Sequence, residues 1–183
     1  TNEAVSLETY SDYAQMDKII GNRVEKTFVP GRNLVFLSLA AAHAAGNGFD
    51  TVVTGVCEDD NANYPDCRGK FVTELNSAVA AAIEPMEVHV FAPLLHCSKA
   101  QAIRDVVELP LSWEALSLSH TCYAGEYPPC GKCHSCVLRA QGFLEAGQPD
   151  PLVVRAWIEG KTVLPKGPNY DHLRGNWGLL GWV

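Results

Sequence analysis

The chain lacks any long apolar run. No stretch reaches the roughly 18 to 20 consecutive apolar residues that a helix needs to span a bilayer. It also lacks a basic segment followed by an apolar stretch near its start, which is the pattern of a secretory signal peptide. These absences predict a protein that neither enters a membrane nor is exported, so we expect it in the cytoplasm.

Basic residues are few. Lys and Arg number 14 against 21 Asp and Glu, which gives a formal net charge of −7. Proteins that bind nucleic acids usually carry a basic patch that neutralises phosphates. The charge therefore argues against direct nucleic-acid binding and favours a small-molecule substrate. The 183 residues, 47% of them hydrophobic, are enough for one domain with an apolar core.

The apolar pattern predicts alternating helices and strands. An Ala- and Leu-rich run from Arg32 to near Gly46 predicts a buried helix. The β-branched run 51–56 predicts a strand buried on both faces of a parallel sheet. Further elements are expected as a helix over 68–84, a strand over 86–91, and helices over 98–108 and 134–145. The proline-containing residues 147–183 predict an added strand pair or a loosely packed tail.

This order of elements predicts an α/β fold with a parallel sheet. In such sheets ligands bind outside the carboxyl ends of the strands. The loops 55–68 and 92–99 are therefore the places where we expect a functional site.

The densest chemical signal is a group of four cysteines with the spacing C-x7-C-x2-C-x2-C, namely Cys122, Cys130, Cys133 and Cys136. Four thiolates suit the tetrahedral coordination of a structural Zn²⁺ ion. Gly131 permits the backbone angles that a turn between two ligands often needs. Disulfides would need an oxidising compartment, and His134 could replace one sulfur, but the cysteines keep the better spacing. The remaining cysteines are interpreted as small core or loop residues: Cys57, Cys67 and Cys97.

Three polar clusters flank the predicted strands. Arg32 and Asn33 begin a helix, where N–H groups and a guanidinium suit phosphate or carboxylate, although a capped helix with a surface Arg is equally consistent. Segment 54–68 carries carboxylates that could hold Mg²⁺ or accept from the N–H groups of a heterocycle, with a solvated acidic loop as the alternative. Lys99 also begins a helix and can reach phosphate oxygens, although lone lysines are usually surface residues.

Taken together, these segments resemble the 7-cyano-7-deazaguanine synthase family. The resemblance rests on Thr27-Phe28-Val29-Pro30-Gly31-Arg32-Asn33-Leu34, Thr54-Gly55-Val56, Tyr64-Pro65-Asp66-Cys67-Arg68, Lys99-Ala100 and the four cysteines. It implies a parallel-sheet nucleotide-binding fold of the pyrophosphatase type (adenine nucleotide alpha hydrolase-like), here partial, over residues 27–146. It also implies a structural zinc segment over 120–146 and often a homodimer. Residues 1–26 are then an irregular lead-in and residues 147–183 an extension.

The resemblance also implies a reaction. The family uses ATP and Mg²⁺ to convert 7-carboxy-7-deazaguanine and ammonia to 7-cyano-7-deazaguanine in queuosine biosynthesis. Carried over to the matching positions, it implies Lys99 and Arg68 as catalytic residues. The implied substrate- or nucleotide-binding residues are Arg32, Asn33, Thr54, Gly55, Asp66 and Arg68.

One family feature is absent. A phosphate loop of the form Ser-Gly-Gly-x-Asp-Ser should lie well upstream of Arg32, and the sequence does not contain it. We therefore expect that the chain alone does not bind ATP in the family's way and that a longer protein or a partner chain supplies the loop. The alternative is a diverged deazapurine-binding module, or a ligase that attaches a deazapurine to another acceptor.

Overall fold

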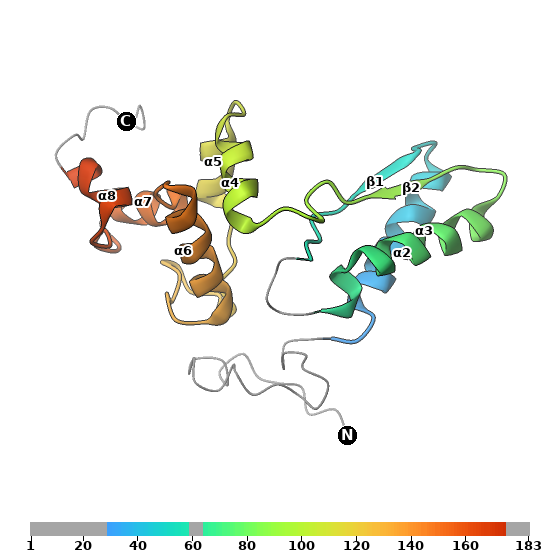
Figure 1. Ribbon diagram of the computed structural model, residues 1–183, viewed down its shortest axis with the longest axis horizontal. Helices are drawn as coiled ribbons and strands as arrows, with labels where there is room; N and C mark the ends of the chain where they lie inside the picture. The colour runs from blue at the N-terminus through green and yellow to red at the C-terminus, as the bar shows by residue number, and fades with distance from the viewer. Residues whose placement is uncertain (1–28, 59–63, 175–183) are drawn as a thin grey trace, which may run out of the picture. The chain divides into compact units, whose positions relative to one another are not determined.

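The computed structural model describes residues 29–58 and 64–174. The predicted lead-in 1–26 and the acidic residues Asp59 and Asp60 lie outside these ranges. The chain forms two compact units that meet in sequence between Ser98 and Lys99 (Figure 1). We call the described parts the N-terminal unit (residues 29–98) and the C-terminal unit (residues 99–174). Residues 147–174 belong to the same unit as the cysteines.

The N-terminal unit is a small α/β layer structure. Its elements are α2 (Arg32–Gly46), β1 (Thr51–Val53), the 3-10 turn η2 (Pro65–Cys67), α3 (Gly69–Ile83) and β2 (His89–Phe91). β1 and β2 pair in parallel, with Val52 opposite Val90. Both helices pack against one face of this strand pair (Figure 1). The core between them consists of Leu37, Ala41, Ala44, Leu75, Val79, Val88 and Val90.

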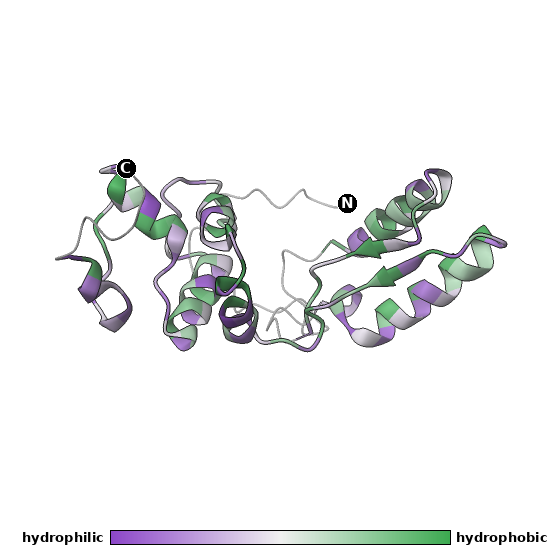
Figure 2. Ribbon diagram, turned by 90° about the horizontal axis from the view of Figure 1, so that it is seen from above, coloured by the Kyte–Doolittle hydropathy of each residue, from purple (hydrophilic) through white to green (hydrophobic). Residues whose placement is uncertain are grey.

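The helices and strands predicted for this unit are present, but the strands are shorter than the expected 51–56 and 86–91, and the expected burial of the first strand is wrong. Only the face of β1 that carries Val52 meets the helices, whereas Val53 is 66% exposed. On β2, Val90 is fully buried and Phe91 is 49% exposed. The hydropathy of both strands is visible in Figure 2. One helical layer covers the pair among the described residues, so its second face is bare.

The regular elements of the C-terminal unit are all helical among its described residues. Its elements are α4 (Lys99–Val107), α5 (Ser112–Leu118), α6 (His134–Ala146), α7 (Pro151–Ile158), α8 (Pro168–Asp171) and the 3-10 turn η3 (His172–Arg174). A non-helical segment over 119–133 joins α5 to α6. α4 packs on α6, and α5 packs on α7. Within the ranges that the structure describes, no helix is long and apolar enough to cross a membrane.

The end of the chain corrects the expectation of a strand pair or loose tail. α7 begins because the Asp150 side chain accepts the N–H of Leu152 and Pro151 supplies a preset first-turn angle. The helix buries Leu152 and Val154. Val154 then packs with residues further along the chain in a second small core, namely Leu164, Leu173, Trp157 and Tyr170. Proline therefore starts a helix here.

Candidate functional site

The loops that leave the two strands are fastened to each other. Thr54, the first residue after β1, donates its backbone N–H to the carbonyl of Phe91 at 2.9 Å. Further along, the N–H of Glu58 donates to Leu95 at 2.8 Å, and the thiol of Cys57 donates to the carbonyl of Cys97 at 2.9 Å. The two loops at the carboxyl edge of the sheet, where a ligand is expected, therefore form one surface.

Asn33 and Asp66 connect the start of α2 to the turn before α3. The backbone N–H of Asn33 donates to Oδ2 of Asp66 at 3.0 Å, and its side-chain amide donates to the carbonyl of Asp66 at 3.1 Å. The same amide donates to the sulfur of Cys67 at 3.3 Å. Asp66 is 7% exposed, and a carboxylate at a helix N-terminus is favourably placed. The N-terminus predicted to receive an external anion thus has one N–H bound by the chain's own carboxylate.

Glu58 joins both loops to the start of α3. Its Oε1 accepts the backbone N–H of Gly69, and its Oε2 lies 3.2 Å from Nδ1 of His96. Arg68 precedes Gly69 as the residue before the helix, and its side chain is exposed. Sequence reasoning counted Glu58 only as one of several carboxylates and did not single out His96. Their positions in the two expected loops were the available signal.

The N-terminal unit brings several of the predicted binding residues to neighbouring segments. Arg32 and Asn33 stand at the start of α2, which contacts the turn that holds Asp66, while Thr54 and Gly55 directly follow β1. Arg32 and Arg68 are exposed. Lys99 begins α4 in the C-terminal unit. Its closeness to Arg32 and Arg68 stays a prediction.

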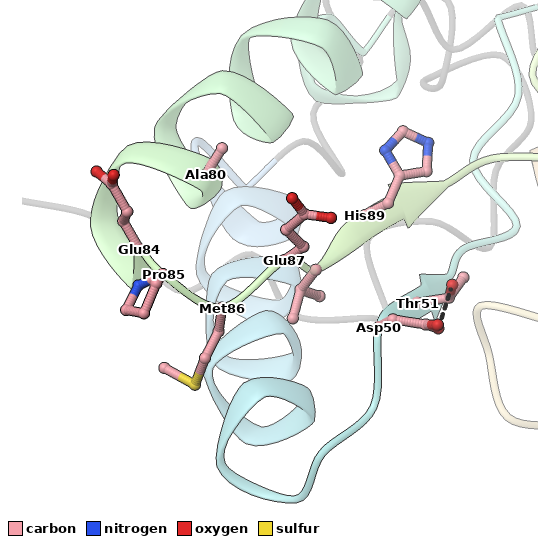
Figure 3. Close-up of a pocket in the computed structure, with 9 residues that line it drawn as sticks. Asp50, Thr51, Ala80, Glu84, Pro85, Met86, Glu87 and His89 are labelled. Carbon is pink, nitrogen blue, oxygen red and sulfur yellow. Dashed lines mark hydrogen bonds between the residues drawn. The ribbon is translucent and has the colours of Figure 1, made fainter.

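A cavity of about 680 Å³ lies at the other end of the strands. The residues that line it precede or begin β1 and β2 or lie near the end of α3. They include Asp50, Glu84, Glu87 and His89, which bring three carboxylates and an imidazole to the cavity (Figure 3). Asp50 is engaged by the hydroxyl of Thr51 at 2.8 Å. None of the residues predicted for substrate or nucleotide binding lines this cavity.

The four cysteines of the C-terminal unit converge. The Sγ atoms of Cys122, Cys130, Cys133 and Cys136 all lie within 4.8 Å of one another. The Cys130 and Cys136 sulfurs are 3.9 Å apart, close to the roughly 3.8 Å between two thiolates on a tetrahedral zinc with bonds of about 2.3 Å. Gly131 has φ 70°, the left-handed angle expected for the turn between ligands. His134 is not part of the converging set in the described chain.

The backbone and the crowding of the sulfurs set the pKa values of the thiols. Burial alone would raise the pKa of Cys122, but backbone N–H groups, chiefly that of Cys130, lower it to about 6. Burial and the neighbouring Cys133 raise the pKa of Cys136, and burial raises that of Cys130. Cys130 and Cys136 therefore hold their protons more tightly than an ordinary cysteine. A divalent cation offsets the electrostatic repulsion between neighbouring thiolates and favours the deprotonated form of the thiols that coordinate it. The four cysteines are therefore suited to hold a metal ion.

Comparisons with known proteins agree with these motifs. The family described as "Queuosine biosynthesis protein QueC" matches residues 3–147. A 7-cyano-7-deazaguanine synthase of Chromobacterium violaceum is 49% identical over 135 residues, which is 74% of this chain and 57% of the relative. The corresponding protein of Laribacter hongkongensis is 51% identical over 133 residues, covering 70% and 56%. That of Gloeobacter violaceus is 43% identical over 156 residues, covering 83% and 66%.

The chain spans a little over half to two thirds of the length of these curated relatives. The match includes the start of α2, the turn with Asp66, the loops after β1 and β2, and all four cysteines. It stops before α7. The chain therefore belongs to the family of the queuosine biosynthesis protein QueC.

Proposed function

We propose that this chain is the substrate-binding and zinc-bearing portion of a 7-cyano-7-deazaguanine synthase. Its reaction is the ATP-dependent conversion of 7-carboxy-7-deazaguanine and ammonia to 7-cyano-7-deazaguanine. The proposal is carried by one observation above all: family motifs far apart in sequence meet where Asn33 donates to Asp66 at the start of α2. The names of the relatives, each a 7-cyano-7-deazaguanine synthase, support the same reaction.

The proposed roles follow from side-chain chemistry. The exposed guanidinium groups of Arg32 and Arg68 can each hold a carboxylate or phosphate through two parallel N–H donors. Lys99 supplies a point charge for developing negative charge. Asp66 has a positioning role, since it fixes Asn33 and with it the start of α2 next to Arg32. Thr54 and Gly55 lie at the strand end, where a ligand can approach the backbone.

The nucleotide does not fit this chain alone. A phosphate site of this kind is a nest of backbone N–H groups in a glycine-rich loop, and the sequence holds no Ser-Gly-Gly-x-Asp-Ser segment. Arg32 and Lys99 supply charge and cannot supply such a nest. We therefore assign the part of the site that holds ATP and Mg²⁺ to a further segment.

Exposed apolar side chains of the N-terminal unit support the proposal that a further segment covers it. Parallel strands are normally covered on both faces, yet Val53 and Phe91 are half to two thirds exposed. The helix α2 is apolar on more than its core side, with Phe36 61% and Leu39 65% exposed. A helix that is hydrophobic all round is usually a buried one. These surfaces suit additional α/β structure that carries the phosphate loop.

For the metal we propose a structural zinc ion. The donor set is four sulfurs, three of them from buried cysteines and one from the half-buried Cys130, which matches structural sites with four protein ligands. Such an ion contributes folding free energy and takes no part in the reaction. Its proposed task is to hold the segment between α5 and α6 in one conformation.

The decisive experiment measures AMP release and nitrile formation from 7-carboxy-7-deazaguanine, ammonia and ATP. The chain alone is expected to show no turnover. Turnover is expected once the chain is joined to, or mixed with, the phosphate-loop segment of a relative. Lys99→Gln should then abolish activity, whereas Lys166→Gln, an exposed lysine outside the family match, should not. Full turnover by the 183 residues alone would contradict the assignment of the nucleotide site to another segment.

A further inference from the structure

The residues that follow the family match contact the four-cysteine segment and the residues on both sides of it. The match ends at residue 147, and the chain continues through α7, α8 and η3 to Arg174. We call residues 148–174 the brace. It reaches the cysteine segment at Tyr127, at Arg139 and at the end of α6, and each contact uses a different part of the brace.

The first contact is at Tyr127, three residues before Cys130. Its hydroxyl donates to Oε2 of Glu159 at 2.9 Å and accepts from Nε of Arg155 at 3.0 Å. The guanidinium of Arg155 and the ammonium of Lys161 lie 4.7 and 4.6 Å from the centre of the Tyr127 ring. Cations at this distance are attracted to an aromatic face. The loop between the first two cysteines is thereby tied to α7.

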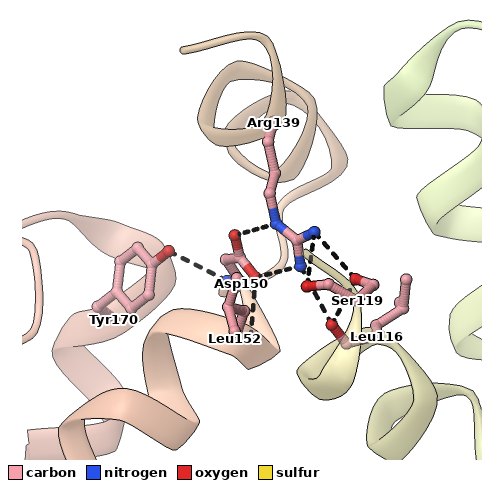
Figure 4. Close-up of polar contacts among 6 residues, drawn as sticks. All are labelled: Leu116, Ser119, Arg139, Asp150, Leu152 and Tyr170. Carbon is pink, nitrogen blue, oxygen red and sulfur yellow. Dashed lines mark hydrogen bonds and ion pairs between the residues drawn. The ribbon is translucent and has the colours of Figure 1, made fainter. Parts of the chain in front are cut away.

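The second contact is at Arg139, one helical turn after Cys136. Its guanidinium meets Asp150 of the brace at two points, and it also donates to the hydroxyl of Ser119 at 2.9 Å and to the carbonyl of Leu116 at 3.2 Å (Figure 4). Ser119 lies just before Cys122. One buried side chain therefore joins the brace to the segments on both sides of the cysteines.

The third contact closes the end of α6. The side-chain amide of Asn169 donates to the carbonyls of Phe143 and Gln148 at 3.0 and 2.9 Å. The carbonyl of Phe143 also accepts the backbone N–H of Gln148 where α6 ends, with Gly147 as its C-cap, so the Asn169 amide adds a side-chain bond from the brace to the end of α6. The brace can hold these positions because it has its own core around Val154, and because the hydroxyl of Tyr170 accepts the N–H of Asp150 at 3.1 Å.

We propose that the brace holds the four cysteines in their ligating arrangement before a metal binds and slows the metal's departure afterwards. Ordering a loop costs conformational entropy for each residue that is fixed. A loop that is already ordered loses less on binding, and opening it must break the contacts at Tyr127 and Arg139. The effect is preorganisation, which acts mainly on the rate of dissociation.

The test uses Tyr127→Phe, which keeps the ring and removes the hydroxyl, and Asp150→Asn, which keeps the shape and removes the charge. Amide hydrogen exchange over residues 122–136 is followed in the metal-free full chain. Zinc release to an excess of chelator is followed in the metal-loaded chain. We expect faster exchange in both variants, and zinc release faster by about two- to fivefold for Tyr127→Phe and at least about tenfold for Asp150→Asn. Tyr64→Phe, in the other unit, and Glu145→Gln, exposed on α6, should match the unaltered chain.

The outcomes separate this inference from the proposed zinc site. Absence of zinc from the unaltered chain removes the zinc proposal, and hydrogen exchange in the metal-free chain still decides whether the brace orders the cysteines. If Asp150→Asn fails to fold, Tyr127→Phe decides alone, because its ring and the core of the brace are retained. Unchanged exchange over 122–136 in Tyr127→Phe, with unchanged zinc release, overturns the proposal.

Discussion

Asp150 and Arg139 form a two-point ion pair inside the C-terminal unit. Nε of Arg139 lies 2.6 Å from Oδ2 of Asp150, and Nη2 lies 2.8 Å from Oδ1. The side chain of Asp150 is 4% exposed and that of Arg139 is 10% exposed. Arg139 belongs to the part of the chain that matches the family, whereas Asp150 follows it and begins α7. The pair therefore joins a family element to a helix outside the match.

Asp150→Ala should destabilise the C-terminal unit strongly. The substitution leaves a guanidinium buried without its counter-charge, which typically costs about 3–5 kcal/mol. It also removes the cap of α7. The matched control is Asp171→Ala, because the exposed pair between Asp171 and Arg174 is expected to contribute about 0–1 kcal/mol.

Urea unfolding followed by tryptophan fluorescence checks this, since all four tryptophans lie at or after residue 113. Equal losses of unfolding free energy in the two variants would contradict the importance of the buried pair.

Each of the four clustered cysteines should be needed for metal binding. Cys133→Ser should lower the zinc content of freshly purified protein from one ion per chain to near zero, because a structural site needs all four ligands and its binding energy is folding energy. Cys57→Ser is the control, since a serine hydroxyl can keep the bond to the carbonyl of Cys97. Metal analysis of the two variants decides the matter. Zinc retained by Cys133→Ser would show that the cluster is not the site.

Local patterns predicted most of the elements and the cysteine cluster. Apolar residues recur every four positions at Phe71, Leu75, Val79 and Ile83 and predict the helix α3, and two of these, Leu75 and Val79, lie in the core. The cluster was predicted because ligand spacing within a short segment constrains geometry directly. The prolines of residues 147–183 gave no prediction of α7, although Asp150 before Pro151 is a typical cap.

Contacts between distant segments could not be predicted in the same way. Nothing in the spacing of Arg139 and Asp150, or of Tyr127 and Glu159, indicates that they meet, because both contacts depend on how α6 and α7 pack. The exposure of Val53 shows a different limit, namely a predicted burial that is not found in the described residues. Its β-branched strand predicts burial on both faces, yet among the described residues no layer covers the face that carries Val53.

The contact between Tyr127 and Glu159 should weaken in acid. Hydrogen bonds from Lys161 and Tyr127 lower the pKa of Glu159 in the folded chain. A carboxyl whose folded pKa is lowered adds stability that is present above its ordinary pKa of about 4.3 and is lost as the pH falls through the folded value. Glu159→Gln should therefore be less stable than the unaltered chain at pH 7 and indistinguishable from it near pH 3.

Thermal unfolding of both proteins at the two pH values measures this difference. Glu145→Gln, which alters a carboxylate on α6 away from Tyr127, should match the unaltered chain at both. A difference between Glu159→Gln and the unaltered chain that persists undiminished near pH 3 would exclude the charge of Glu159 as its cause.

Asp66 should hold the start of α2 in place. Asp66→Ala removes the acceptor for the N–H of Asn33, a capping-type bond worth about 0.5–2 kcal/mol. Amide hydrogen exchange in the first turn of α2 should accelerate accordingly. Asp66→Asn should restore most of the protection, because its carbonyl oxygen can accept the same N–H. Asp50→Ala, an exposed carboxylate that contacts only Thr51 among the described bonds, should leave α2 unchanged. Equal exchange in Asp66→Ala and the unaltered chain would show that the bond is not needed.

The last prediction concerns Gly142, which lies where α6 packs against α4. A Cβ at this position would lie 2.9 Å from Cβ of Lys99 and 3.3 Å from Cδ1 of Ile103. The first contact involves an atom next to the backbone, so α4 has to move. Overpacking of this kind costs about 1–3 kcal/mol, more than the roughly 0.5–1 kcal/mol that Ala gains over Gly inside a helix.

Gly142→Ala should therefore destabilise the C-terminal unit and displace Lys99, the proposed catalytic lysine. In the chain supplied with the phosphate-loop segment, nitrile formation should fall well below that of the unaltered chain at a temperature where both remain folded and hold zinc. Gln141→Ala, exposed on the same helix, should keep both stability and activity. A Gly142→Ala protein with unaltered unfolding free energy would show that α4 yields without cost, and full activity would show that the position of Lys99 is not critical.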